Sequence, residues 1–148
     1  MIAEVTERAA SAFASLGARQ PPHPVHADLH PGNVMAVAGG LSVLDFDDCG
    51  VSHPVHDLAI TAYHLRPFPH EGPLMAGYES VRPVPEHSRG EFESLVAARN
   101  VALLNDTVTV DAAWVRDLLP TYVPNTITKL RHYLRTGEYR HDIDGLID

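Results

Sequence analysis

The spacing of apolar residues along the chain predicts helices at both ends and a pair of short strands between them. Apolar positions recur at helical spacing through residues 2–16, and Gly17 follows them as a candidate C-cap. Two short apolar runs, 33–37 and 41–46, flank a small-residue segment at 38–40. This pattern predicts a β-hairpin with a three-residue loop, preceded by an extended connector.

The remaining apolar positions predict that the rest of the chain is helical. We expect a buried helix that begins at Pro54, a loop and then a short helix at 74–81, a longer helix at 86–105, a helix around Trp114 that ends at Pro120, and a last helix at 124–135. The fold class is therefore mainly α with a small β-hairpin. We expect one domain over residues 1–148: a leading helix at 1–17, the hairpin region at 23–50, a helical subdomain at 54–135 and a loosely held tail at 136–148.

Composition narrows the choice of partners. The 148 residues carry a formal net charge of −8, which argues against a nucleic-acid partner and is compatible with a cationic ligand. The sequence shows neither an apolar run long enough to span a bilayer nor a signal peptide, so we expect no membrane partner and a cytoplasmic location. Cys49 is the only cysteine, which excludes an intrachain disulfide.

The hairpin brings polar side chains together. With a three-residue loop, Val37 pairs with Leu41 and Asn33 lies opposite Asp45, so both side chains reach the same small volume. Their oxygen atoms are ligands that Mg²⁺ accepts together with substrate phosphates. Asp28 lies five residues before Asn33, and this spacing followed by a hairpin and a second Asp is the arrangement of a kinase catalytic loop.

Three segments resemble one known superfamily. The sequence HADLHPGN at 26–33 resembles the catalytic loop of the aminoglycoside phosphotransferase and choline kinase superfamily, which has a protein-kinase-like fold. LDFDD at 44–48 resembles its metal-binding segment, and HDLA at 56–59 resembles the start of the next helix. The resemblance implies ATP as phosphoryl donor, Mg²⁺ as cofactor, and a small-molecule hydroxyl as acceptor. It covers residues 23–63 most strongly.

The resemblance also implies a role for each matching residue. Asp28 matches the catalytic base, and Asn33 and Asp45 match residues that bind the metal and hence the nucleotide phosphates. His26 matches a histidine that packs under the loop and fixes its backbone, and Asp57 matches an aspartate that holds the loop from the following helix. In the expected strand, Asp47 faces the same side as Asp45, which makes Asp47 a weaker candidate for a second metal or a substrate amine.

Two departures from the superfamily pattern affect these expectations. Position 27 is Ala where most relatives have Gly, and a methyl group is costly there if the backbone φ is positive. No glycine-rich phosphate-covering loop precedes the catalytic loop. No lysine-bearing strand precedes it either, because the only lysine is Lys129. We therefore expect a C-terminal lobe without its N-terminal lobe. The apolar hairpin residues then lack part of their cover, which predicts a homodimer or a separate N-lobe partner.

Alternative interpretations remain open at this stage. A truncated, non-catalytic lobe that acts as an interaction module explains the missing lysine equally well. Several histidines around 26–30 and 53–56 suggest zinc, but the expected converging ligand set is incomplete. Acidic residues on the late helices are candidates for binding a substrate amine, although a solvated face explains each of them more simply: Glu91, Glu93, Asp106, Asp111 and Asp117.

Overall fold

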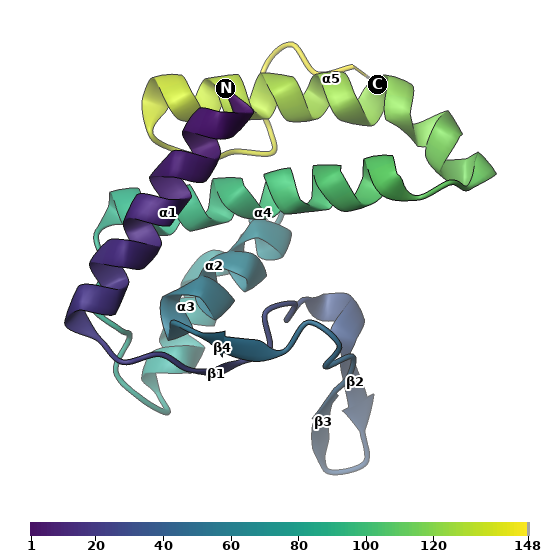
Figure 1. Ribbon diagram of the computed structural model, residues 1–148. Helices are drawn as coiled ribbons and strands as arrows, with labels where there is room; N and C mark the ends of the chain where they lie inside the picture. The colour runs from purple at the N-terminus through teal and green to yellow at the C-terminus, as the bar shows by residue number, and fades with distance from the viewer. Residues whose placement is uncertain (148) are drawn as a thin grey trace.

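The molecule consists of a helical body with two small antiparallel sheets along one side (Figure 1). The computed structural model describes residues 1–147. Within them the helices are α1 (Ile2–Arg19), α2 (Pro54–Leu65), α3 (Glu71–Glu79), α4 (Arg89–Thr109) and α5 (Ala113–Thr136). None of these described helices is long and apolar enough to cross a membrane. The mainly α fold class with a small hairpin is confirmed.

One of the two sheets was not predicted from the sequence. Strand β1 (His23–Val25), expected to be part of an extended connector, pairs with β4 (Gly50–Ser52). This pairing joins the two ends of the segment that contains every candidate catalytic residue except Asp57. The sheet therefore fixes the start and the end of that segment close to the beginning of α2.

The hairpin forms, but its predicted register is wrong by one residue. Strands β2 (Val34–Val37) and β3 (Gly40–Val43) pair Val37 with Gly40 and Val34 with Val43. The loop has two residues, because Gly39 adopts a φ of 93° that closes a tighter turn than expected. The residue that faces Asn33 is therefore Leu44, whose backbone N–H donates to the Asn33 carbonyl at 2.9 Å, and not Asp45.

Helix boundaries differ from the sequence expectations at both ends of the chain. Helix α1 continues past Gly17, because Arg19 in its last turn bonds Ser15 and forms an ion pair with Glu91 of α4 at 2.8 Å. The two helices expected around Pro120 are one helix, α5, with Pro120 and Pro124 inside it. The helix bends near its start instead of ending there (Figure 1).

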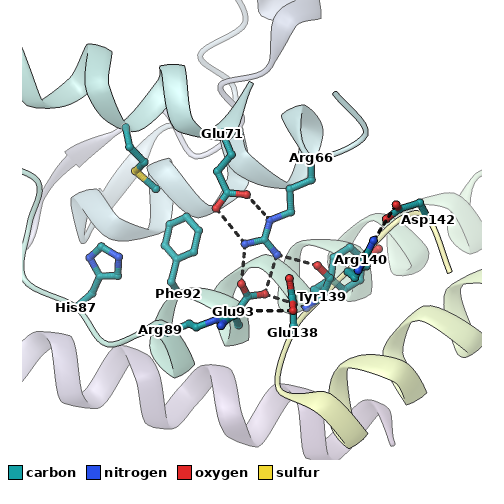
Figure 2. Close-up of a pocket in the computed structure, with 11 residues that line it drawn as sticks. Arg66, Glu71, His87, Arg89, Phe92, Glu93, Glu138, Tyr139, Arg140 and Asp142 are labelled. Atoms are coloured by element: carbon teal, nitrogen blue, oxygen red, sulfur yellow. Dashed lines mark hydrogen bonds and ion pairs between the residues drawn. The ribbon is translucent and has the colours of Figure 1, made fainter. Parts of the chain in front are cut away.

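The C-terminal tail is packed against the helices, contrary to the expectation that it is loosely held. The Tyr139 side chain is fully buried, and its backbone N–H donates to Glu93 at 2.9 Å. Glu93 in turn forms an ion pair with Arg66, which also binds Glu71 and the Tyr139 carbonyl (Figure 2). We call Arg66, Glu71 and Glu93 the Arg66 cluster. Glu93 therefore does not lie on a solvated face, because only 4% of its surface is exposed.

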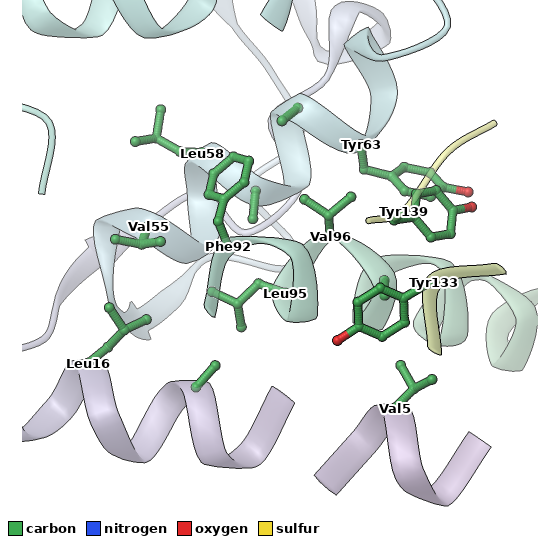
Figure 3. Close-up of a cluster of buried hydrophobic side chains, with 14 of the residues drawn as sticks. Val5, Leu16, Val55, Leu58, Tyr63, Phe92, Leu95, Val96, Tyr133 and Tyr139 are labelled. Atoms are coloured by element: carbon green, nitrogen blue, oxygen red, sulfur yellow. The ribbon is translucent and has the colours of Figure 1, made fainter. Parts of the chain in front are cut away.

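The hydrophobic core lies where α1, α2 and α4 meet, and Tyr133 of α5 and Tyr139 of the tail close one end (Figure 3). Val5 and Leu16 come from α1, whereas Leu95 and Val96 come from α4, and all four are essentially inaccessible to solvent. Burial of such aliphatic side chains contributes roughly 1.5–3 kcal/mol each. The core thus fixes α2 and α4 relative to each other, and these are the two helices that contact the candidate site.

We expect Glu93→Ala to destabilise the protein by about 3–5 kcal/mol, because it leaves the buried Arg66 guanidinium without its main counter-ion. Chemical denaturation monitored by circular dichroism measures this change. Glu4→Ala, at an exposed ion pair on α1, is the control and should change the free energy of unfolding by less than about 1 kcal/mol. Equal effects of the two substitutions would show that the Arg66 cluster does not support the fold.

Candidate active site

The loop between β1 and β2 carries Asp28, and helix α2 holds this loop from one side. The two carboxylate oxygens of Asp57 accept hydrogen bonds from the backbone N–H groups of His26 (3.0 Å) and Ala27 (2.7 Å). One helical turn later, the Thr61 hydroxyl donates to the Leu29 carbonyl at 2.7 Å. Three backbone groups of the loop therefore depend on two side chains at positions i and i+4 of α2.

The His26 side chain lies between the loop and the segment that follows the hairpin. Its Nε2 atom is 2.9 Å from the Leu44 carbonyl, which can only accept, so Nε2 carries the proton. Its Nδ1 atom then accepts from the backbone N–H of Asp28 at 3.3 Å. The imidazole, which is buried against Phe46, thus connects the Asp28 backbone to the residue that precedes Asp45.

Two non-glycine residues at the site have a positive φ: Ala27 (62°) and Asp45 (60°). A side chain in this left-handed region costs roughly 1–2 kcal/mol, although aspartate tolerates the region better than alanine. The short hydrogen bond from Ala27 to Asp57 is one of the contacts that hold the strained backbone in place. The φ of Ala27 is therefore positive, which is the conformation in which a methyl group at position 27 is costly.

Two side chains donate to the Asp28 carboxylate, and a histidine ring lies slightly farther away. One carboxylate oxygen forms an ion pair with Arg99 of α4, and the other accepts from the Asn33 amide nitrogen at 3.2 Å. The His30 Nε2 atom is 3.6 Å from the same second oxygen. The Asp28 side chain is 18% exposed, so it is partly open to an incoming molecule while its orientation is fixed.

Asn33 presents one polar side-chain atom that no residue in the described part of the chain bonds. Its amide nitrogen donates to both the backbone carbonyl and the carboxylate of Asp28, which leaves the amide oxygen, Oδ1, for other ligands. Asn33 belongs to the 3₁₀ turn η1 (Pro31–Asn33), in which a Cβ at Gly32 would lie 2.7 Å from the His30 ring, so glycine lets that ring accept from the Gly32 N–H. An amide oxygen at this position is a suitable ligand for a hard cation.

Asp45 and Asp47 lie outside the strand in which they were expected. Strand β3 ends at Val43, so strand alternation orients neither side chain, and Asp47 belongs to a turn. Asp45 directly follows Leu44, whose backbone is bonded to both Asn33 and His26, and its carboxylate is exposed. The Asn33 amide oxygen and the Asp45 carboxylate are oxygen ligands of the type that a hard cation accepts. In the described part of the chain no group of three or more His, Cys, Asp and Glu side chains is arranged to hold a metal.

A further imidazole next to the site, that of His64, stays neutral at physiological pH. The His64 ring packs against the His30 ring at a tilt of 34°, with 4.7 Å between the ring centroids. Burial, together with the positive charge of Arg99, lowers the pKa of His64 to about 4. The neighbourhood of Asp28 therefore holds one permanent cation, Arg99, and His64 adds a polar group without adding charge.

A larger cavity lies away from the loop that carries Asp28. It has a volume of about 740 Å³ and is lined by the Arg66 cluster together with residues of the tail (Figure 2). The Arg66 guanidinium in its wall already bonds Glu71, Glu93 and the Tyr139 carbonyl. A smaller cavity of about 310 Å³ lies beside the loop and is lined by Ala27 and Arg99.

Two residues that complete the site were not assigned a role from the sequence. Arg99 occupies a position in the apolar stripe of α4, and a charged residue in such a stripe indicates a buried partner. Thr61 lies four residues after Asp57 on the same helical face. The helical periodicity of the sequence places Arg99 and Thr61 on inward-facing sides of their helices. Only the folded structure shows that Arg99 contacts Asp28 and that Thr61 contacts Leu29.

Comparison with known proteins places the chain in a family. Residues 2–92 match the model of a phosphotransferase enzyme family, named APH. The chain belongs to this family. The match includes the whole loop and hairpin segment and both helices, α1 and α2, that precede and follow it. No curated protein matches at a comparable level.

Two solved structures share the fold of this APH family member. An amicoumacin kinase, hAmiN, in complex with AMP-PNP, Ca²⁺ and Ami is 20% identical, with a TM-score of 0.56 over 86% of this chain and 45% of that chain. A microcompartment-associated aminopropanol kinase is 21% identical, with a TM-score of 0.65 over 94% of this chain and 48% of that chain. The chain therefore spans about half the length of these two proteins.

We expect Ala27→Gly to stabilise the protein by about 1 kcal/mol, because glycine adopts a positive φ without strain. Ala10→Gly, at an exposed interior position of α1, is the matched control and should destabilise by about 1 kcal/mol. Both changes can be measured by urea denaturation. A destabilising effect at both positions would contradict the strained conformation of Ala27.

Proposed function

We propose that the chain is the catalytic lobe of a phosphotransferase that transfers the γ-phosphoryl group of ATP to a hydroxyl group of a small molecule. The observation that carries this proposal is the arrangement of Asp28: Asn33 and Arg99 orient its carboxylate, and Asp57 fixes its loop. Family membership supports the reaction class, and the names of the two kinases of similar fold support a small-molecule acceptor.

In the proposed reaction, Asp28 accepts the proton of the acceptor hydroxyl as the hydroxyl oxygen attacks the γ-phosphorus. The new oxygen–phosphorus bond forms while the bond to ADP breaks. Asn33 Oδ1 and Asp45 would hold a divalent cation, which when bound would neutralise part of the phosphate charge. Because phosphoryl transfer depends mainly on positioning and electrostatics, the loop must hold Asp28 in one orientation.

We propose further that a nucleotide-covering lobe contacts the hairpin. The chain spans less than half of either kinase of similar fold, which supports a requirement for additional chain. The hairpin projects away from the helical body (Figure 1), and its apolar side chains are exposed, Leu41 most of all at 72%. Exposed apolar residues that lie together commonly mark an interface, so a second lobe that covers the hairpin would bury them. A homodimer through the same surface is the alternative.

Metal binding tests the proposed site directly. In titrations with Mn²⁺ and ATP followed by NMR, we expect paramagnetic broadening centred on Asn33 and Asp45. Asp45→Asn should weaken binding of the ion by about tenfold or more, because it replaces a carboxylate ligand by a neutral amide. Asp144→Asn, in the C-terminal tail, is the control and should leave binding unchanged. Broadening centred on another part of the chain would contradict the assignment.

A variant of Asp28 separates metal binding from proton transfer. In the assembly that includes a nucleotide-covering lobe, Asp28→Asn should lower kcat by about a hundredfold or more while Mn²⁺ and ATP still bind. A non-catalytic interaction module would show neither turnover in the wild type nor a difference between the variants.

A further inference from the structure

The His30 ring uses one of its two nitrogen atoms in the loop and leaves the other open. Its Nδ1 atom accepts a hydrogen bond from the backbone N–H of Gly32 at 3.0 Å, so Nδ1 carries no proton and the ring proton is on Nε2. The neighbouring carboxylate oxygen, Asp28 Oδ2, lies 3.6 Å from Nε2, which is too far for a direct hydrogen bond. In the described part of the chain no other acceptor bonds Nε2. His30 therefore presents an N–H donor beside the candidate base.

The His30 ring has a fixed orientation and remains accessible. The bond from Gly32 holds one edge of the ring, and the His64 ring of α2 packs against it with 4.7 Å between the centroids. The side chains of His30 and Asp28 are 28% and 18% exposed, so a small molecule can reach both. The two side chains thus form an oriented donor and acceptor pair at the surface of the loop.

A hydroxyl group fits between these two atoms. Because Nε2 and Oδ2 are 3.6 Å apart, one oxygen atom can lie at about 2.8 Å from both, which is an ordinary hydrogen-bond distance. That oxygen accepts from Nε2–H and donates its own proton to Oδ2. Asn33 also donates to Oδ2, at 3.2 Å, but a carboxylate oxygen has a second lone pair for the hydroxyl.

We infer that His30 contacts the acceptor: its Nε2–H donates to the oxygen of the acceptor hydroxyl while that hydroxyl donates to Asp28. The inference rests on the proposed function, because it concerns the acceptor of that reaction. During transfer the hydroxyl proton moves to Asp28 Oδ2, and a lone pair of the oxygen forms the bond to the γ-phosphorus. The electron pair of the broken bond stays on ADP. His30 keeps its proton and holds the attacking oxygen in place.

This pair of side chains also specifies the chemical class of the nucleophile. A hydroxyl oxygen has two lone pairs, so one accepts from His30 while the other attacks phosphorus. The nitrogen of an amine has one lone pair when it is neutral and none when it is protonated. An amine that accepts from His30 therefore has no lone pair left for the attack, and the pair of His30 and Asp28 favours alcohols over amines.

Two measurements on the wild-type chain test the inference without ATP or turnover. In ¹⁵N NMR spectra of the ring nitrogens at neutral pH, His30 should be the tautomer that is protonated at Nε2. A high-resolution crystal structure of the full chain in ethylene glycol should show one oxygen atom, from the glycol or from water, within hydrogen-bond distance of both His30 Nε2 and Asp28 Oδ2.

Two substitutions of His30 then separate contact with the acceptor from a purely structural role. Asparagine keeps an oxygen that can accept from Gly32 but has no group at the place of Nε2, whereas glutamine places an N–H donor near Nε2 and loses the bond from Gly32. In the assembly that includes a nucleotide-covering lobe, His30→Asn should lower kcat about tenfold or more while Mn²⁺ and ATP still bind. His30→Gln should retain more of kcat than His30→Asn does. A purely structural role predicts the opposite order.

His70→Asn, at an exposed histidine before α3, is the matched control and should leave kcat unchanged. Thermal unfolding verifies that each variant is folded. Three results would overturn the inference: a His30 ring protonated at Nδ1, a crystal structure in which no oxygen atom bonds both Nε2 and Asp28 Oδ2, or a folded His30→Asn variant with the kcat of the wild type.

The proposed function is tested separately, by Mn²⁺ and ATP binding at Asn33 and Asp45 and by the loss of turnover in Asp28→Asn. If these results hold and His30→Asn is fully active, the proposed function stands and the role of His30 is wrong. A wild-type assembly that neither binds Mn²⁺ and ATP nor turns over would instead contradict the proposed function, and the inference with it.

Discussion

The carboxylate of Asp57 is the contact on which the rest of the site depends. It accepts two backbone hydrogen bonds from residues 26 and 27, and it comes from α2, a helix whose apolar face is buried in the core. A carboxylate that accepts two N–H groups forms stronger bonds than a neutral acceptor does. Without the Asp57 carboxylate, fewer contacts would keep the Ala27 backbone at its positive φ, and Asp28 would lose its orientation. The core therefore holds the backbone of residues 26 and 27 through this one side chain.

The strain at Ala27 and Asp45 lies on both sides of the candidate catalytic group, which is where folded proteins tend to retain such strain. The surroundings of Asp28 add a second constraint, because the Arg99 ion pair connects the loop to α4 across 71 residues of sequence. The two helices thus act on adjacent residues, α2 on the backbone of Ala27 and α4 on the side chain of Asp28. This division explains how a loop with little regular structure presents a single carboxylate orientation.

The sequence predicted the fold class and the loop because both depend on local signals. Helical periodicity identified α2 and α4, and the motif at 26–33 identified Asp28 and Asn33. The hairpin register was not predictable by strand length alone, since one residue in the Gly39 turn changes which residue faces Asn33. Pro120 suggested a helix end, but tertiary packing of α5 tolerates it as a bend. The partners of Arg99, Thr61 and Glu93 are distant in sequence, and no local pattern specifies such contacts.

Hydrogen exchange at the amides of His26 and Ala27 tests the central claim most directly. If Asp57 holds the loop, both amides are protected in the wild-type protein, and Asp57→Ala increases their exchange rates about a hundredfold or more while amides of α4 in the core keep their protection. Unchanged protection of the Ala27 amide in a folded Asp57→Ala variant would contradict the account, because another group would then have to hold the loop that carries Asp28.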